Sequence, residues 1–173
     1  MKETNLLLAV LLVTLAGCTS SDESTSIAEN PPIDSSKYVL QNEPDGAISV
    51  TEARENSKDQ DDIVMVGRIG GGSQAFIDNR AAFMVIDASM VVVADGEDSS
   101  ENEICLDDCC ASELAACTML VKIVDDQGKP LAIDARTLLN AQVDDMVVIQ
   151  GKVQRDDEQG LFTVAANGVY LRR

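Results

Sequence analysis

Short runs of β-branched and aliphatic residues, separated by Gly, Asp and Asn, fill the chain from Asp62 to Leu171. Runs of this length between turn-forming residues are typical of strands. Trp is absent and aromatic residues make up 3% of the sequence, so a core must be built mainly from Val, Ile, Leu, Met and Ala. The pattern therefore predicts a mainly β domain. The expected strands are residues 63–69, 82–87, 90–93, 118–124, 146–153, 161–166 and 169–171.

One segment of this region, residues 134–140, is predicted to be a short helix with Asp134 as its N-cap and Asn140 near its end. Three main strands precede it, and a closing hairpin that turns at Gln159-Gly160 follows it. This order is that of the five-stranded Greek-key barrel of OB folds. Residues 143–153, with their Gly-Lys unit, and Val66-Gly67-Arg68 also resemble strands of OB-fold domains. The resemblance implies an OB-like barrel with one short helix; another small barrel or a sandwich is the alternative.

The N-terminus has the three zones of an export signal: Lys2, an apolar run over residues 6–15, and small residues before Cys18. The run is shorter than the roughly 20 residues that a transmembrane helix needs. Leu15-Ala16-Gly17-Cys18 resembles the lipobox of bacterial lipoproteins. The resemblance implies that residues 1–17 are a signal peptide removed before Cys18, whose thiol then carries lipid. A plain secretory signal and a buried N-terminal helix are the alternatives.

Lipid on Cys18, with acyl chains such as palmitate, would anchor the protein to a membrane of the cell envelope, because two or more chains hold firmly where one binds reversibly. Thr19, where an Asp would resemble an inner-membrane retention signal, favours the outer membrane in a cell that has two. Residues 18–60 are rich in Ser, Asp, Glu and Asn, and they predict a disordered tether. Two short pieces of the tether, residues 37–40 and 47–53, could become ordered by packing against the domain. The domain itself is expected to span residues 61–173.

Charge and composition exclude several functions. The formal net charge is −17, which opposes binding to the phosphates of nucleic acids. The chain contains no His, so the commonest general base and the imidazole ligands of zinc and copper are missing. No segment resembles an enzyme motif. We therefore expect a non-catalytic protein without a cofactor, whose partners are the membrane and an envelope protein or glycan.

Four cysteines lie in an acidic insertion over residues 94–117 between the second and third main strands: Cys105, Cys109, Cys110 and Cys117. With Cys18 lipidated they form an even set in an oxidising compartment, which predicts two disulfides. The alternatives are a thiolate site for zinc or copper(I) and a redox role for the vicinal pair. The spacing lacks the paired C-x2-C of common zinc sites. The acidic residues around them are expected to be a solvated loop, with calcium binding as the alternative.

The ligand face of an OB-like domain is framed by the loops after the first and fourth strands. Here these are residues 70–80 and 154–160, and the triple glycine in the first is expected to be a flexible loop. The candidate ligand contacts are Arg68, Arg80, Lys152 and Arg155, for which surface salt bridges are the alternative role. The sequence thus predicts a tethered binding or structural module of the cell envelope. A metal-binding or redox lipoprotein that uses the cysteine cluster is the alternative.

Overall fold

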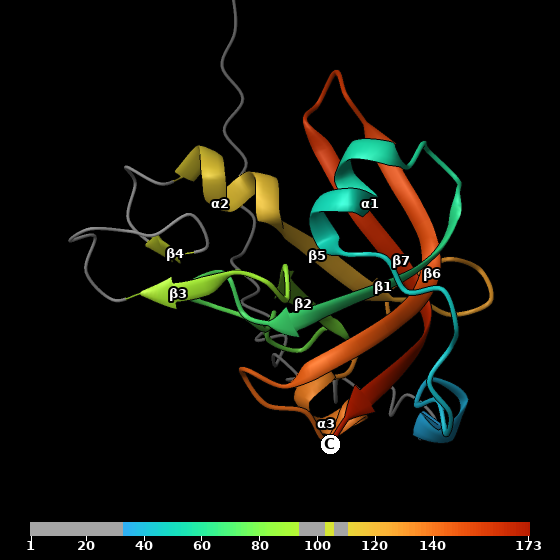
Figure 1. The fold of residues 1–173 in the computed structure, drawn as a ribbon. Helices are drawn as coiled ribbons and strands as arrows, with labels where there is room; N and C mark the ends of the chain where they lie inside the picture. Colours follow the sequence, from blue (N-terminus) through green and yellow to red (C-terminus); the bar gives the residue numbers. More distant parts are fainter. Residues whose placement is uncertain (1–32, 94–102, 106–110) are drawn as a thin grey trace, which may run out of the picture. The chain divides into compact units, whose positions relative to one another are not determined.

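Five strands form the centre of the structure, a computed structural model that describes residues 33–93, 103–105 and 111–173 (Figure 1). They pair in the order β1-β2-β5-β7-β6, and β6 pairs back to β1, which closes a small barrel. β5 and β7 run parallel to each other, and the other four pairs are antiparallel. The strands are β1 (Asp62–Ile69), β2 (Ala82–Ile86), β5 (Thr118–Ile123), β6 (Met146–Asp156) and β7 (Leu161–Arg172).

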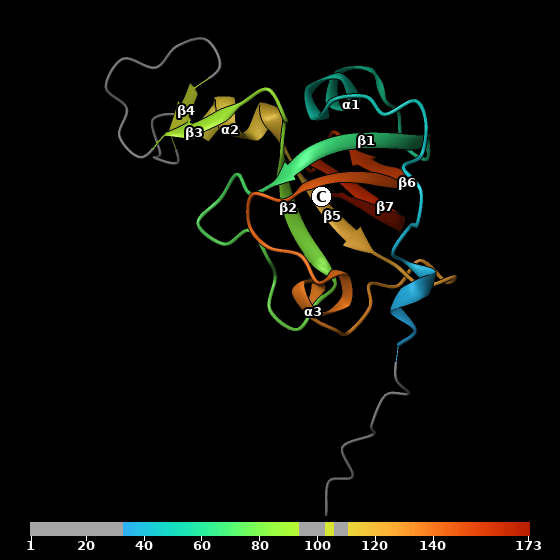
Figure 2. The same ribbon diagram turned by 60° about the horizontal axis from the view of Figure 1, so that its bottom comes forward.

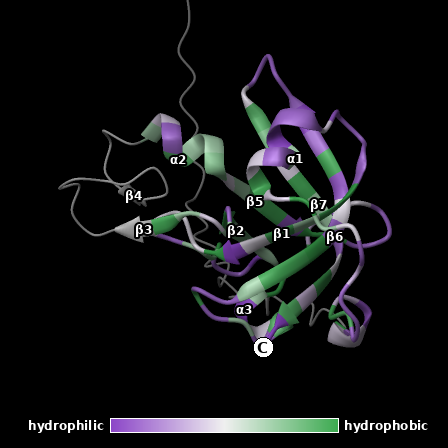
Figure 3. Cartoon of the chain, viewed as in Figure 1, coloured by the Kyte–Doolittle hydropathy of each residue, from purple (hydrophilic) through white to green (hydrophobic). Residues whose placement is uncertain are grey.

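The barrel interior is filled by alternate residues of each strand, as the two-residue period of a strand requires. In β1, Ile63, Met65 and Ile69 are buried, and in β2 Phe83 and Val85 are fully buried. Most of the other core side chains are Val, Ile, Leu, Met and Ala, as the composition predicts. Figure 3 shows the hydrophobic residues along the strands and the hydrophilic ones in the loops.

The helix α3 (Ala135–Leu139) lies between the third and fourth barrel strands, β5 and β6. Asp134 caps its first turn by accepting the N–H of Arg136, and Asn140 ends it in the left-handed conformation at φ 51°. Leu138 and Leu139 are buried in the core. The prediction of a mainly β, OB-like five-stranded barrel with this helix is therefore confirmed.

The segment before β1 corrects the predicted domain boundary. Residues 33–60 are not a disordered tether, because they contain the 3-10 helix η1 (Ser35–Lys37) and the helix α1 (Val50–Asn56). Ile48 donates its N–H to the carbonyl of Val64 (3.0 Å) and accepts the N–H of Val66 (2.9 Å), so this segment extends the sheet beside β1. Figure 2 shows it running along the barrel. The domain therefore begins at Ile33 rather than at residue 61.

Burial of a few apolar side chains explains why residues 33–60 are ordered. Val50 and Ala53 of α1 are fully buried in the barrel core, and Tyr38 is 5% exposed. Leu40 donates its N–H to the carbonyl of Val169 (2.9 Å), where β7 has passed beyond β5. The predicted signal peptide, Cys18 and the first part of the predicted tether lie outside the described residues.

The insertion between β2 and β5 contains helix and strand, while the side chains of the acidic residues predicted to form a solvated loop lie outside the described residues. β3 (Val91–Val93) and β4 (Glu103–Cys105) form a parallel pair, and the helix α2 (Ala111–Cys117) leads into β5. The side chains of Cys117 and Ile86 are buried together, with Met90 and Leu114 packed against them.

Within residues 33–93, 103–105 and 111–173, no helix has the length and apolarity to cross a membrane.

The buried position of Val50 predicts that α1 contributes to the stability of the barrel. Val50→Ala should lower the free energy of unfolding by about 2 kcal/mol, because it leaves a cavity in the core. Urea denaturation measures this loss. Val143→Ala is the matched control, since Val143 is 54% exposed and its truncation should change stability by less than about 0.5 kcal/mol. Equal effects of the two changes would show that α1 does not belong to the core.

Candidate functional site

The four basic residues predicted to contact a ligand do not form one cluster. Arg68 is the second-last residue of β1 and lies opposite Met146 of β6. Met146 is six residues before Lys152, which corresponds to about 20 Å along the strand. The Arg68 guanidinium donates to the carbonyl of Ala88 at 3.4 Å. Arg80 lies in the loop before β2. Lys152 and Arg155 both belong to β6 but lie three residues apart and have different partners, so the structure gathers no pair of the four residues into one cluster.

Arg155 is engaged within the domain. Its guanidinium donates to the carbonyls of Arg54 (2.9 Å) and Ser57 (3.0 Å) at the end of α1, and to Asp157 (2.7 Å). It also lies 5.2 Å from the centre of the Phe162 ring. These contacts join α1 to the β6–β7 hairpin, so the arginine has a structural role.

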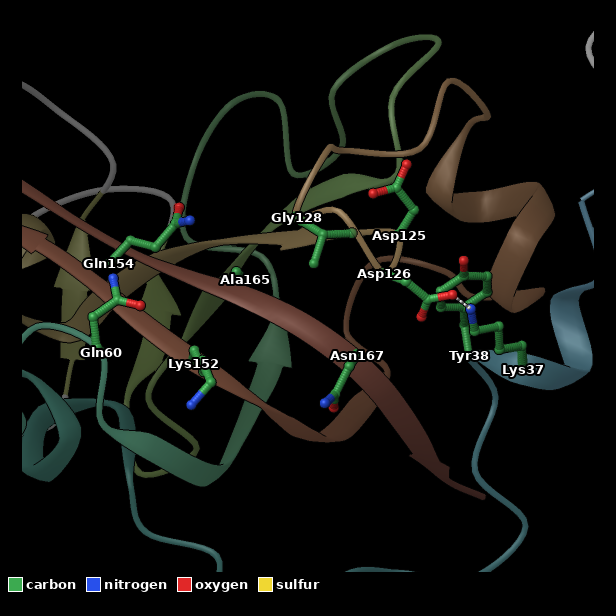
Figure 4. A pocket seen from close by; sticks show the side chains of 11 residues that line it. Lys37, Tyr38, Gln60, Asp125, Asp126, Gly128, Lys152, Gln154, Ala165 and Asn167 are labelled. Carbon is green, nitrogen blue, oxygen red and sulfur yellow. Dashed lines mark hydrogen bonds and ion pairs between the residues drawn. The ribbon is translucent and has the colours of Figure 1, made fainter.

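Two adjoining hollows on the outer face of β5, β6 and β7 form the candidate site, which we call the groove. They have volumes of about 350 and 360 Å³ and share the side chains of Gln60 and Gln154. Figure 4 shows the first hollow, with these two amides near one end and the Lys37–Asp126 ion pair near the other. The polar side chains that line the groove between its ends are Gln60, Lys122, Lys152, Gln154, Thr163 and Asn167.

These side chains face outward because of strand register. Lys122 of β5 lies opposite Ala165 of β7, and Ala165 lies opposite Lys152 of β6. Thr163 and Gln154 form the neighbouring cross-strand pair. Their strand neighbours, such as Val153 and Val164, are fully buried in the core. The strands that carry the groove are therefore fixed from within by the barrel interior.

Hydrogen bonds join three of the groove residues. The Lys122 ammonium donates to Oε1 of Gln154 (2.8 Å), and the Thr163 hydroxyl lies 3.3 Å from the same oxygen. Gln60 is held at φ 68° while its N–H donates to the carbonyl of Val153 (3.0 Å). Amides and hydroxyls both donate and accept hydrogen bonds. The set can thus bind hydroxyl, amide or carboxylate groups of a ligand.

Carboxylates lie at both ends of the groove, where they shape the turns. Asp125 accepts the N–H groups of Gln127 and Lys129, both at 2.9 Å. Asp156 accepts those of Glu158 and Gln159, both at 3.1 Å. Lys152 forms an ion pair with Asp62 at 2.7 Å, between side chains that are 52% and 81% exposed. Such exposed pairs contribute little to stability, so Lys152 can turn toward a ligand.

Cys117 is the one member of the cysteine cluster whose side chain is described. It is 3% exposed, carries a free thiol and donates to the carbonyl of Leu114 at 3.5 Å. Burial and the nearby Asp87 carboxylate raise the pKa of this thiol, which disfavours the thiolate that metal ions bind. The free thiol of Cys117 does not fit the prediction of two disulfides among the four cysteines. The side chains of Cys105, Cys109 and Cys110 lie outside the described residues, so a disulfide among these three stays a prediction. In the described ranges, no three His, Cys, Asp or Glu side chains are grouped to hold a metal ion.

Asp87, which the sequence did not single out, is a buried carboxylate just after β2, with 2% of its surface exposed. It accepts hydrogen bonds from the backbone N–H (2.9 Å) and the hydroxyl of Thr51, and from the N–H (3.0 Å) and hydroxyl (2.8 Å) of Ser89. Burial alone would raise the pKa of Asp87, but these hydrogen bonds outweigh it and lower the pKa well below its usual range. The carboxylate thus holds the first turn of α1 against the end of β2.

Comparison with known proteins finds no relative of this chain: no family model, no curated protein and no solved structure matches it.

The lowered pKa of Asp87 predicts a pH-dependent contribution to stability. Asp87→Asn should lower the free energy of unfolding by about 2 kcal/mol at pH 7, because it removes a charged acceptor from buried donors. A lowered pKa in the folded state means that this contribution is complete above about pH 4 and declines as pH falls toward the folded pKa. Urea denaturation at pH 7 and pH 3 should show the difference between the two proteins shrinking at pH 3. A constant difference would contradict the charge-based role.

Proposed function

We propose that this chain is a lipid-anchored, non-catalytic binding module of the cell envelope, and that its groove binds a glycan. The observation that carries the glycan assignment is the row of amide and hydroxyl side chains, Gln60, Gln154, Thr163 and Asn167, on one hollowed face. Vicinal sugar hydroxyls match such side chains, since each can donate and accept a hydrogen bond. Most of these residues lie on strands, which favours precise positioning of a ligand.

The kind of apolar side chain that lines the groove favours a glycan over a protein partner. Protein interfaces commonly depend on buried aromatic or Arg anchors near their centre. The large apolar side chains lining the groove are Leu120, Leu161, Tyr38 and Val124, of which Tyr38 is buried and Leu161 is 52% exposed. The lining residues therefore provide no exposed aromatic anchor for a protein partner, while their amides and hydroxyl suit a hydroxyl-rich chain. The absence of His from the sequence supports binding without catalysis.

The lipid anchor rests on the sequence from Leu15 to Cys18. Since the domain begins at Ile33, the tether after Cys18 is roughly 15 residues, with a mean span of about 20 Å if it is flexible. The barrel would then stay close to the membrane surface. The net charge of −17 would repel it from anionic headgroups, so the anchor rather than the surface would hold the protein there.

The anchor is tested by intact mass measurement of the protein recovered from its membrane. We expect the loss of residues 1–17 and an added mass that matches a diacylglyceryl group with or without a further acyl chain. Cys18→Ser should abolish the added mass and release the protein from the membrane fraction, whereas Cys117→Ser should do neither. A mature protein that starts at Cys18 but carries no lipid would contradict the anchor.

The binding role is tested with Gln154→Ala. Retention of the mature protein on a panel of envelope glycans should identify a ligand, and Gln154→Ala should weaken its binding about tenfold, because the loss of a hydrogen-bond partner costs about 1.4 kcal/mol. Gln74→Ala is the matched control, since Gln74 is exposed in the loop after β1 and lines neither hollow. Equal binding by both variants would contradict the groove, and release of sugar products would contradict a non-catalytic role.

A further inference from the structure

We infer that the groove selects an acidic sugar, whose single carboxylate binds Lys122 and Lys152 above Ala165. This inference rests on the proposed glycan-binding function and names the chemistry of the ligand. It starts from the register of the sheet. Ala82, Lys122, Ala165 and Lys152 form one row across β2, β5, β7 and β6.

The row places two lysines on strands that flank a small residue. Neighbouring strands are about 4.8 Å apart, so the Cα atoms of Lys122 and Lys152 are about 10 Å apart. Ala165 lies between the two lysines, and its side chain is too short to fill the space between their long chains. On the other side of Lys122 lies a second alanine, Ala82. The Lys152 ammonium pairs with Asp62 on the β1 side of β6, away from Ala165. Once Lys152 turns from Asp62 toward β7, a carboxylate over Ala165 can accept hydrogen bonds from both lysines, and charge-assisted bonds of this kind are the stronger ones.

The local charge matches one negative charge. In the described part of the chain, the ion pairs include Lys152 with Asp62 but none with Lys122, whose ammonium donates to the neutral amide of Gln154. Lys122, Lys152 and Asp62 together carry a net charge of +1 at the centre of the groove. Farther out, Lys37 and Arg155 offset part of the charge of the four aspartates that line its ends, Asp59, Asp125, Asp126 and Asp156. A carboxylate neutralises the central charge, whereas a doubly charged phosphate would exceed it.

The ends of the groove select against further charges on the ligand. Asp59 accepts the N–H of Arg155, three residues along β6 from Lys152, and Asp125 follows Lys122 by three residues. Three residues of strand span about 10 Å, which exceeds the Debye length of about 8 Å at physiological salt. The aspartates therefore leave the central lysines positive, but they would repel an anion bound beside them. This pattern fits one acidic sugar flanked by neutral sugars, and it disfavours polymers with a charge on every unit.

Apolar residues complete the subsite. Leu120 and Leu161 line the groove beside Lys122 and Thr163, and Leu161 is 52% exposed. The C–H face of a sugar ring can pack against these leucines while its hydroxyls face Gln154 and Gln60. The carboxylate then defines the register of the glycan on the sheet.

The test compares a uronic acid disaccharide, cellobiouronic acid, with its neutral parent, cellobiose, by calorimetry on the mature protein. The acidic sugar should bind at least tenfold more tightly. The preference is read as the ratio of the two affinities for each variant, because Lys122 also bonds Gln154 and its loss can change cellobiose binding. Lys122→Gln should bring this ratio close to one, and Lys152→Gln should lower it by a smaller factor. Lys58→Gln is the control, since it removes the same charge but lies outside both hollows.

The outcomes separate the two proposals. Equal binding of both disaccharides, or an acidic preference that survives Lys122→Gln, would overturn the carboxylate subsite and leave a glycan-binding groove. Tighter binding of triglutamate than of cellobiouronic acid would overturn the acidic sugar in favour of a peptide. If neither disaccharide binds and the glycan panel is also negative, both the subsite and the proposed function are wrong.

Discussion

Seven consecutive residue pairs join β1 to β6, from Asp62 opposite Lys152 to Arg68 opposite Met146, and this pairing turns the sheet into a closed barrel. β6 also pairs with β7 along its whole length, with a register shift between Gln150 and Gly151. A Cβ at Gly151 would lie 2.4 Å from the carbonyl oxygen of Ala165, so the strands can approach this closely only because the residue is glycine. The same approach places Ala165 beside Lys152, and the floor of the groove therefore depends on how the barrel closes.

The parts of the fold that follow local rules could be predicted from the sequence. Runs of alternating or continuous apolar residues identified the five barrel strands, and Asp134 and Asn140 identified the caps of α3. The ordered structure of residues 33–60 was predicted only in part: residues 37–40 and 47–53 were expected to be able to order against the domain, and both carry bridges or helix in the structure. The rest could not be predicted, because it depends on strand edges that neighbouring strands leave unpaired. Val50 and Ala53 supply little apolar surface in a polar segment, yet both are fully buried. α2 was also missed, although Ala, Glu and Leu in Ala111–Cys117 are strong helix formers.

The candidate site was predicted only in part, for a similar reason. Lys152 was identified because it precedes the predicted ligand loop at residues 154–160, and Gln154 was named only as part of that loop. Lys122 was not identified, because its proximity to them depends on the parallel register of β5 and β7. One local signal was present: Lys122 interrupts an apolar strand at a position where its neighbours Val121 and Ile123 point inward. Arg155 shows the opposite error, since a charge near a predicted ligand loop proved to join α1 to a hairpin.

A chain with a net charge of −17 can still present a positive subsite, because long-range and short-range electrostatics act on different scales. At physiological salt, exposed charges more than about 8 Å apart are largely screened. Acidic turn residues such as Asp125 and Asp156 therefore govern repulsion from other anionic surfaces, whereas the strand residues Lys122 and Lys152 govern contact with a bound group. Because the lysines lie on paired strands and the aspartates in turns at the ends, barrel closure sets both the sign and the position of the charge that a ligand meets.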